Sequence, residues 1–341
     1  MIMITIMVGN QNSILVLESS NGYKIHESLK GTHPQRIAFD PQNSDRAYCG
    51  TFGDGLWKTD DGGQTWNIIG KEIISSPHVM SVAVSHLAYG NKFNKVYAGT
   101  EPSALYISND GGESWEKMEA LNNLPSSTLW SFPPRPWTHH VRSIEPDANN
   151  VDYVFVAIEA GALVQSHDGG KTWIDRVEQG PYDTHNLATH PKAPKRLYSS
   201  AGDGYFESFD YGDSWSRPME GLRHQYLYGL AVDPGDPHIV IVSSSVGPGN
   251  AYSIEDAESY VYRKDENGKK WNAISNGLPE PSGTTITLLA ANPKAKGEFY
   301  AANNRGLFFS VDSGISWRAL DIPWPKEYYL QPLWALAVSE K

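Results

Sequence analysis

The sequence predicts an all-β protein, a seven-bladed β-propeller of four-stranded blades that is closed by a composite blade from both ends of the chain. Two observations predict it. A short motif recurs six times at a spacing that fits one blade, and the two ends of the chain carry the strands of a seventh blade. We therefore expect residues 1–341 to form a single domain.

The recurring motif reads Ser/Thr-x-Asp-x-Gly-x-Ser/Thr-Trp, and its copies lie at residues 59–66, 108–115, 166–173, 208–215, 264–271 and 310–317, the fifth being degenerate. Its Asp can accept hydrogen bonds from turn amides, its Gly can take a positive φ, and its Trp offers a large face for burial. The spacing between successive motif tryptophans ranges from 42 residues (Trp173 to Trp215) to 58 (Trp115 to Trp173). We interpret these aspartates as structural rather than catalytic.

The same order of strands precedes each motif. In the first blade, strands are expected at 36–41, 46–52 and 56–58, followed by the hairpin. Several innermost strands end in Asp-Pro, Glu-Pro or Asn-Pro, as at Asp40-Pro41, and a proline at that point ends the hydrogen-bonded ladder. The order predicts that each blade runs from the ring centre outward.

The chain ends are expected to complete the ring. Residues 333–339 match an innermost strand, and residues 3–28 supply three more strands, with Asn21-Gly22 as the last hairpin turn. This pairing would remove the free sheet edges. Two long insertions, 119–140 and 244–259, are expected as loops on the top face, the face opposite the motif hairpins.

Composition limits the classes of partner. The net charge is −11 and no basic stripe occurs, so nucleic acid and membrane surfaces are not expected as partners. The single Cys49 excludes an internal disulfide and fits a reducing compartment, and no stretch approaches the length of a membrane helix. These features predict a cytoplasmic protein.

The repeated hairpins resemble the Asp-box (BNR) repeats, and the resemblance covers nearly the whole chain. It implies a propeller similar to the single-ring sialidase-like and glycosyl-hydrolase-like members. The sequence lacks the Phe-Arg-Ile-Pro start of sialidases and has one ring where xyloglucanases of this type pair two. Such propellers serve several functions, so the function has to be argued from the site.

Candidate site residues gather on the top face, in loops before innermost strands and between second and third strands. Two functional readings follow. One is a divalent metal held by histidines with Glu or Asp; the other is metal-free acid–base chemistry with His140 or His185 as base and Glu159 or Glu101 as acid. The histidines considered as metal ligands are His33, His78, His140 and His185.

Other side chains on these loops are candidates for substrate binding. Aromatic faces suit sugar rings or other planar ligands, and polar side chains at equivalent positions of different blades can add hydrogen bonds. The set comprises Tyr228, Trp334, Trp137, Tyr182, Arg305, Asp54 and Asp203. The alternative for all these residues is a role in packing or solvation of the loops.

Together these features favour a hydrolase or lyase acting on a carbohydrate-like or other polar cyclic small molecule, with or without one divalent metal ion. The alternative is a non-catalytic propeller that binds a protein partner or a glycan. A closed cavity lined by histidine would favour the enzyme, and an open flat patch would favour protein binding.

Overall fold

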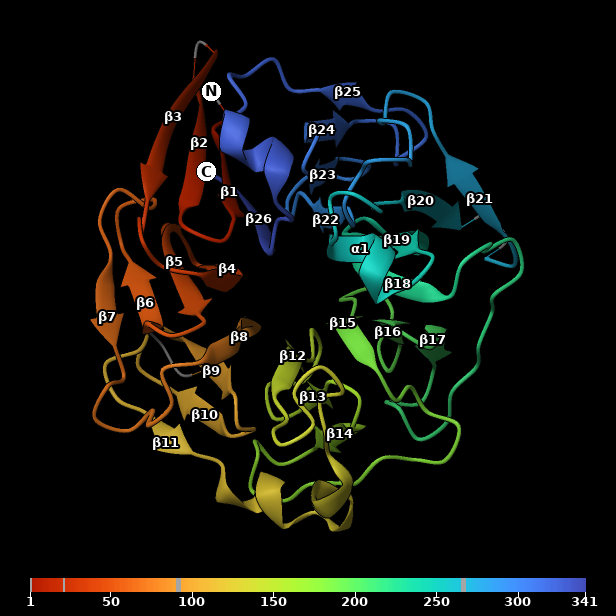
Figure 1. The fold of residues 1–341 in the computed structure, drawn as a ribbon. Coiled ribbons are helices and arrows are strands. Elements are labelled where there is room, and N and C mark those ends of the chain that lie inside the picture. The colour runs from red at the N-terminus through yellow and green to blue at the C-terminus, as the bar shows by residue number, and fades with distance from the viewer. Residues whose placement is uncertain (1, 21, 90–92, 265–267) are drawn as a thin grey trace.

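A computed structural model describes residues 2–20, 22–89, 93–264 and 268–341. The chain forms a closed ring of seven antiparallel sheets around a central axis, and both termini lie in the same blade (Figure 1). The predicted seven-bladed propeller is confirmed. In the described ranges, no helix is both long enough and apolar enough to cross a membrane.

Each blade runs outward from the ring centre, as the motif order predicted. The first blade contains β4 (Pro34–Asp40), β5 (Asn43–Thr51), β6 (Gly55–Thr59) and β7 (Asn67–Ile69), and the second contains β8 (Val79–Tyr89), β9 (Phe93–Thr100), β10 (Leu105–Ser108) and β11 (Glu116–Lys117). The third blade contains β12 (Val141–Pro146), β13 (Val154–Ile158) and β14 (Ala162–Ser166). The fourth contains β15 (Thr184–Ala188), β16 (Leu197–Ala201) and β17 (Gly204–Ser208). The fifth blade contains β18 (Tyr226–Asp233), β19 (Asp236–Ser245), β20 (Ser259–Lys264) and β21 (Trp271–Ile274). The sixth contains β22 (Leu288–Ala291), β23 (Phe299–Asn303), β24 (Gly306–Ser310) and β25 (Arg318–Ala319). The seventh contains β26 (Ala335–Glu340), β1 (Ile4–Gly9), β2 (Ile14–Ser20) and β3 (Gly22–Ser28).

The outermost strand of the third and fourth blades is reduced to a single bridge. Gln165 pairs with Ile174, and Glu207 pairs with Ser216. In the fourth blade, Pro218 follows two residues after the bridge and has no N–H to extend the ladder.

The composite closure is also confirmed. Strand β26 pairs antiparallel with β1 over six residues, from Ile4 opposite Glu340 to Gly9 opposite Ala335. Strand β2 then pairs with β3, in a register that brings Ser20 opposite Gly22. Asn21, the predicted turn residue, lies outside the described residues. The ring is thus sealed by backbone hydrogen bonds between the two ends of the chain.

Each motif hairpin is a self-contained corner, as Asp110 illustrates. Its carboxylate accepts hydrogen bonds from the Ser114 amide (2.9 Å) and hydroxyl (2.5 Å), and Trp115 Nε1 donates to the Gly112 carbonyl (3.1 Å). Gly112 has φ 93°, a conformation that favours glycine. Residues 265–267 of the degenerate fifth copy lie outside the described residues, and its Trp271 donates instead to the Pro218 carbonyl (2.8 Å).

The aspartates of these motif hairpins are expected to make the stability of the fold sensitive to acid. Hydrogen bonds from the turn outweigh burial and lower the carboxyl pKa in the five regular copies; the aspartates are Asp61, Asp110, Asp168, Asp210 and Asp312. At Asp168 the Thr172 hydroxyl is the main cause, and the pKa falls to about 2. A carboxyl with a depressed pKa stabilises the fold above its unfolded value of 3.8, and this contribution is lost as pH falls through the folded value.

We therefore expect the melting temperature to fall between about pH 4 and pH 2, and to fall less steeply in Asp168→Asn. Thermal unfolding followed by circular dichroism across this range measures both slopes. If the melting temperature fell equally steeply with pH in the parent and in the variant, Asp168 would not contribute to acid sensitivity through a lowered pKa.

The two insertions contain short helices. Residues 119–140 include 3-10 helices at Glu119–Asn123 and Pro125–Leu129, and residues 244–259 include α1 (Pro248–Tyr252). A third 3-10 helix, Lys326–Leu330, precedes β26. Helix α1 lies in front of the inner strands of the fifth blade, beside the ring centre (Figure 1). The insertions therefore reach the place where the innermost strands converge.

Candidate functional site

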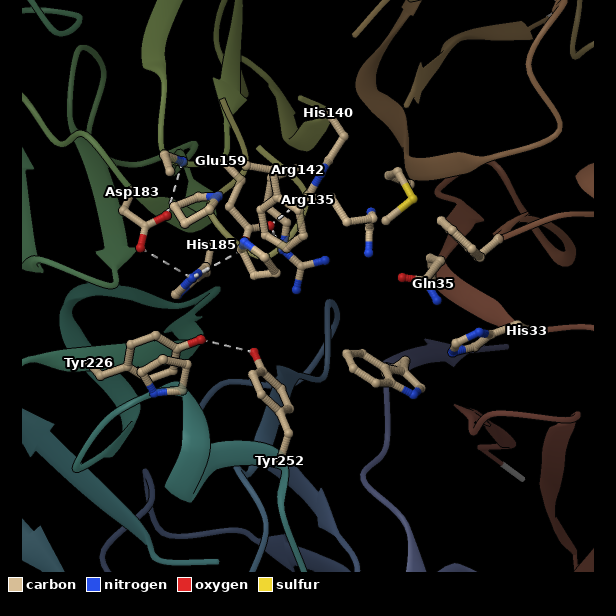
Figure 2. Close-up of a pocket in the computed structure, with 18 residues that line it drawn as sticks. His33, Gln35, Arg135, His140, Arg142, Glu159, Asp183, His185, Tyr226 and Tyr252 are labelled. Carbon is tan, nitrogen blue, oxygen red and sulfur yellow. Dashed lines mark hydrogen bonds and ion pairs between the residues drawn. The ribbon is translucent and has the colours of Figure 1, made fainter. Parts of the chain in front are cut away.

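A cavity of about 510 Å³ lies where the innermost strands meet on the top face. Its polar lining comes from the first, third, fourth and fifth blades, and Phe132, Pro133, Pro134 and Arg135 of the first insertion form one wall. Helix α1 adds Pro248 and Tyr252 to the lining, and Tyr252 is labelled in Figure 2. The volume falls within the range typical of small-molecule sites.

Strand ends place the charged side chains in this cavity. His140 comes directly before β12 and Arg142 lies within it, while Glu159 directly follows β13. Asp183 directly precedes β15 and His185 lies within it. Because loops before innermost strands and after second strands open on the same face of a propeller, these residues meet although they belong to two blades.

His140 is held between two carboxylates. Its side chain is buried, and Nε2 lies 2.6 Å from Glu159 Oε2. On the other side of the ring, Nδ1 lies 3.3 Å from Glu101 Oε2, which is an ion-pair distance, but the contact lacks hydrogen-bond geometry. Burial disfavours the charged ring, but the two carboxylates outweigh it and raise the pKa of His140. Arg135 pairs with Glu101 and donates two hydrogen bonds to it, from Nε (2.9 Å) and from Nη2 (2.6 Å).

Both glutamates stay ionised in this arrangement. Burial acts to raise the pKa of Glu159, but the Arg142 guanidinium and His140 lower it to about 2. At Glu101, the adjacent His140 ring and the two hydrogen bonds from Arg135 outweigh burial and also lower the pKa to about 2. A carboxylate with so low a pKa serves as a fixed negative charge and is a poor proton donor near neutral pH.

Arg142 fixes the other side of Glu159. Its Nε lies 3.3 Å from Glu159 Oε2, and its Nη2 donates a hydrogen bond to the Tyr228 hydroxyl. The guanidinium also lies over the Tyr228 ring, 5.1 Å from its centroid. The surrounding negative groups and tyrosines outweigh burial and raise the pKa of Arg142, so it is a permanent cation at the base of the cavity.

One corner of the cavity brings together Glu159, Asp183 and His185. His185 Nε2 lies 3.8 Å from Glu159 Oε1 and 3.9 Å from Asp183 Oδ2 (Figure 2). His185 Nδ1 lies 2.5 Å from the Leu227 carbonyl oxygen, and Asp183 Oδ1 accepts a hydrogen bond from the Ala160 amide (3.0 Å). Burial, reinforced by the charge of Glu159, raises the pKa of Asp183.

Aromatic side chains form the remaining wall. The rings of Trp334 and Tyr252 stack with centroids 5.4 Å apart, and the hydroxyls of Tyr252 and Tyr226 lie 3.2 Å apart. Phe132 meets the His140 ring edge-on at 4.8 Å. The cavity therefore pairs flat apolar surfaces with a charged corner.

The structure brings together part of the set predicted from the sequence. His33, His140, His185, Glu159 and Trp334 line the cavity. Glu101 and Tyr228 lie behind this lining, in contact with His140 and Arg142 respectively.

The other predicted residues lie elsewhere. His78 stacks on Phe52 outside the lining, and Asp54 lines a separate surface depression with Trp57. Tyr182 lines another depression, beside Arg176. Trp137 and Arg305 are exposed and lie outside the lining. Asp203 is half-buried and also lies outside the lining, and its carboxylate accepts a hydrogen bond from the Asp183 amide (3.3 Å). These residues do not form one constellation.

Sequence reasoning missed Asp183, Arg142, Arg135 and Tyr252, all of which line the cavity. Asp183 and Arg142 each lie two residues from a predicted histidine, and side chains two apart on a strand share a face. That spacing was the available signal. No comparable signal marks Arg135 or Tyr252, whose positions depend on the path of the insertions.

Comparisons with known proteins agree with this fold. The model of the BNR/Asp-box repeat family matches residues 106–117. The chain is 22% identical over 210 residues to the xyloglucanase Xgh74A of Acetivibrio thermocellus, covering 50% of this chain and 24% of that protein. It is 25% identical over 159 residues to a xyloglucanase of Hypocrea jecorina, covering 46% and 18%. The chain thus spans about a quarter or less of the length of these relatives.

Solved structures give the same result. An ancestral GH74 enzyme superposes with a TM-score of 0.63 at 16% identity, covering 90% of this chain and 38% of that one. YCF48 bound to the D1 peptide superposes with a TM-score of 0.57 at 20% identity, covering 85% and 82%. At these identities the likeness shows the propeller fold.

Proposed function

We propose that the protein is an enzyme, a hydrolase or a lyase, that acts on a carbohydrate-like or other polar cyclic small molecule in the central cavity. The observation that carries the proposal is the convergence of Glu159, Asp183 and His185 on one corner of a cavity with aromatic walls. Asp183 and the His185 imidazole are the kinds of group that move protons in such reactions, and Glu159 supplies a fixed negative charge beside them. Aromatic faces suit the apolar faces of a ring-shaped substrate.

The hydrogen bond at His185 supports a chemical role for that side chain. A backbone carbonyl can only accept, so Nδ1 carries the proton donated to Leu227 and a neutral ring keeps a lone pair on Nε2. That lone pair faces Glu159 and Asp183. It can accept a proton or bind a cation, the two readings that the sequence left open.

The similarity to xyloglucanases supports a carbohydrate as the substrate class. The cavity supports it independently, because the Trp334 ring lies in the lining while Arg135 and Arg142 present cationic groups beside it. A polar ring could stack on Trp334 and place a hydroxyl or carboxyl oxygen toward the charged corner.

A matched pair of tryptophan variants tests the binding wall. We expect Trp334→Leu to weaken binding of the substrate about tenfold, which corresponds to about 1.4 kcal/mol and is the size expected for one aromatic contact. Trp137→Leu is the control, because its side chain is 80% exposed and lies outside the lining. A panel of neutral and acidic oligosaccharides, followed by product chromatography and calorimetry, gives both turnover and affinity. Equal affinities for the two variants would contradict the proposal.

A second candidate is a non-catalytic propeller that binds protein or glycan. The observation that favours it is the exposure of Trp137 (80%) and Leu129 (61%), both in the 119–140 insertion. Under this alternative, binding would be saturable with no product formed, and Trp137→Leu rather than Trp334→Leu would weaken it.

A further inference from the structure

We propose that Glu159, Asp183 and His185 form a binding site for one divalent cation. The proposal concerns the cavity of the proposed function and deepens it, but it does not require turnover. It differs from the metal set predicted from the sequence. Only His185 of that set belongs to the group that has metal-ligand spacing within the part of the chain that the structure describes.

The spacing of the three ligand atoms fits a metal ion. The selected nitrogen and oxygen atoms all lie within 4.8 Å of one another, with His185 Nε2 at 3.8 Å from Glu159 Oε1 and 3.9 Å from Asp183 Oδ2. Metal bonds to such atoms are about 2.0–2.2 Å long, so two ligands of one ion are about 3–4.4 Å apart. A small closure of the carboxylate pair around an ion suffices.

Each proposed ligand is already oriented through its other polar atom. His185 donates through Nδ1 to the Leu227 carbonyl, and Asp183 Oδ1 accepts from the Ala160 amide. Glu159 Oε2 is held by His140 and Arg142. These contacts leave His185 Nε2, Asp183 Oδ2 and Glu159 Oε1 directed at one another. Metal sites characteristically fix their ligands by hydrogen bonds of this kind.

The burial of His185 provides a second, independent observation. Its side chain is about 1% exposed, and Nε2 makes no hydrogen bond to any residue that the structure describes. Nε2 faces one oxygen of each of two carboxylates in a poorly solvated space. A cation at the centre of the three atoms would be attracted by both carboxylates and could bind Nε2.

The ligand set indicates which ions fit. One imidazole and two carboxylates suit Mn²⁺, Fe²⁺ or Zn²⁺, and none of the three ligands is a thiolate that would favour softer ions. Three protein ligands beside a cavity leave coordination positions open, which is typical of catalytic sites. An ion here would supply polarisation of a substrate oxygen.

Metal binding can be measured on the purified chain without any substrate. After treatment with a chelator and dialysis, Mn²⁺ and Zn²⁺ are titrated separately by calorimetry. We expect one equivalent to bind, and we expect affinity to fall at least tenfold in Asp183→Asn and in His185→Gln. Asp54→Asn and His78→Gln are the matched controls, because both residues lie outside this group, and they should bind as the parent does.

Electron paramagnetic resonance of the Mn²⁺-loaded parent adds a measurement that requires no variant. Coupling of the ion to an imidazole nitrogen is expected in the parent. Absence of stoichiometric binding, absence of nitrogen coupling, or parental affinity in a folded Asp183→Asn would overturn the proposal. Turnover without metal binding would refute this site alone, and metal binding without turnover on any sugar would refute the proposed function alone.

Discussion

Glu207→Gln is expected to destabilise the fold by about 3–5 kcal/mol, because it removes the carboxylate charge that accepts hydrogen bonds from two buried cations. Glu207 Oε1 accepts hydrogen bonds from Lys264, from Arg196 Nη2 (3.2 Å) and from the Tyr205 hydroxyl (2.6 Å). Lys264 and Arg196 are 1% and 6% exposed. The carboxylate thus joins the fourth and fifth blades, and its charge balances two cations in a poorly solvated space. Denaturant unfolding of parent and variant measures the difference.

Two comparisons separate this effect from a general loss of contacts. Glu119→Gln removes an exposed partner of Lys117 and is expected to cost less than about 1 kcal/mol. In the double variant Glu207→Gln with Lys264→Met, the cation that donates to Glu207 is removed together with its acceptor, so the total cost should be smaller than the sum of the single costs. An additive double variant, or a Glu207→Gln protein as stable as the parent, would show that the buried charges do not depend on Glu207.

Glu159→Gln is expected to lower kcat/KM about 10²–10⁴-fold on the substrate identified by the oligosaccharide panel. The change keeps the shape of the side chain but removes the charge that faces His140, Arg142 and His185. It also removes the charge that would bind a cation at this corner. Steady-state kinetics give the loss, and it should fall mainly on kcat if Glu159 acts on the reacting atoms.

The control for this prediction is the same exchange at an exposed position, Glu119→Gln. Circular dichroism must show that Glu159→Gln remains folded, since the residue is also a partner of buried cations. A folded Glu159→Gln protein with activity within tenfold of the parent would exclude the charged corner as the reaction centre.

The fold could be predicted from the sequence because its signal is local and repeated. Each corner carries its own Asp, Gly and Trp, and the contacts of Asp110 and Trp115 are made within the same eight residues. The closure by β26 and β1 followed from strand patterns at both ends of the chain. Such features require no knowledge of neighbouring blades.

The site could be predicted only in part because it depends on contacts between blades. His140 and His185 lie at the starts of innermost strands, and Glu159 follows a second strand. The predicted order of strands in each blade therefore placed all three on the correct face. Counting along the chain cannot tell which loop side chains turn inward. Trp137 and Tyr182 therefore resembled Trp334 in the sequence, although only Trp334 lines the cavity. The role of Arg142 depends on Glu159, which follows β13, and on Tyr228 of β18 in another blade.

The pairing of β26 with β1 also bears on how the protein is made. During synthesis β1 leaves the ribosome well before its partner at residues 335–340, which emerges only after the six other blades. Until then β1 presents an unpaired edge, the kind of edge that can pair wrongly with another nascent chain. Moving the chain ends to a surface turn between two other blades, by circular permutation, would make this blade from one continuous segment and shift the late step elsewhere in the ring.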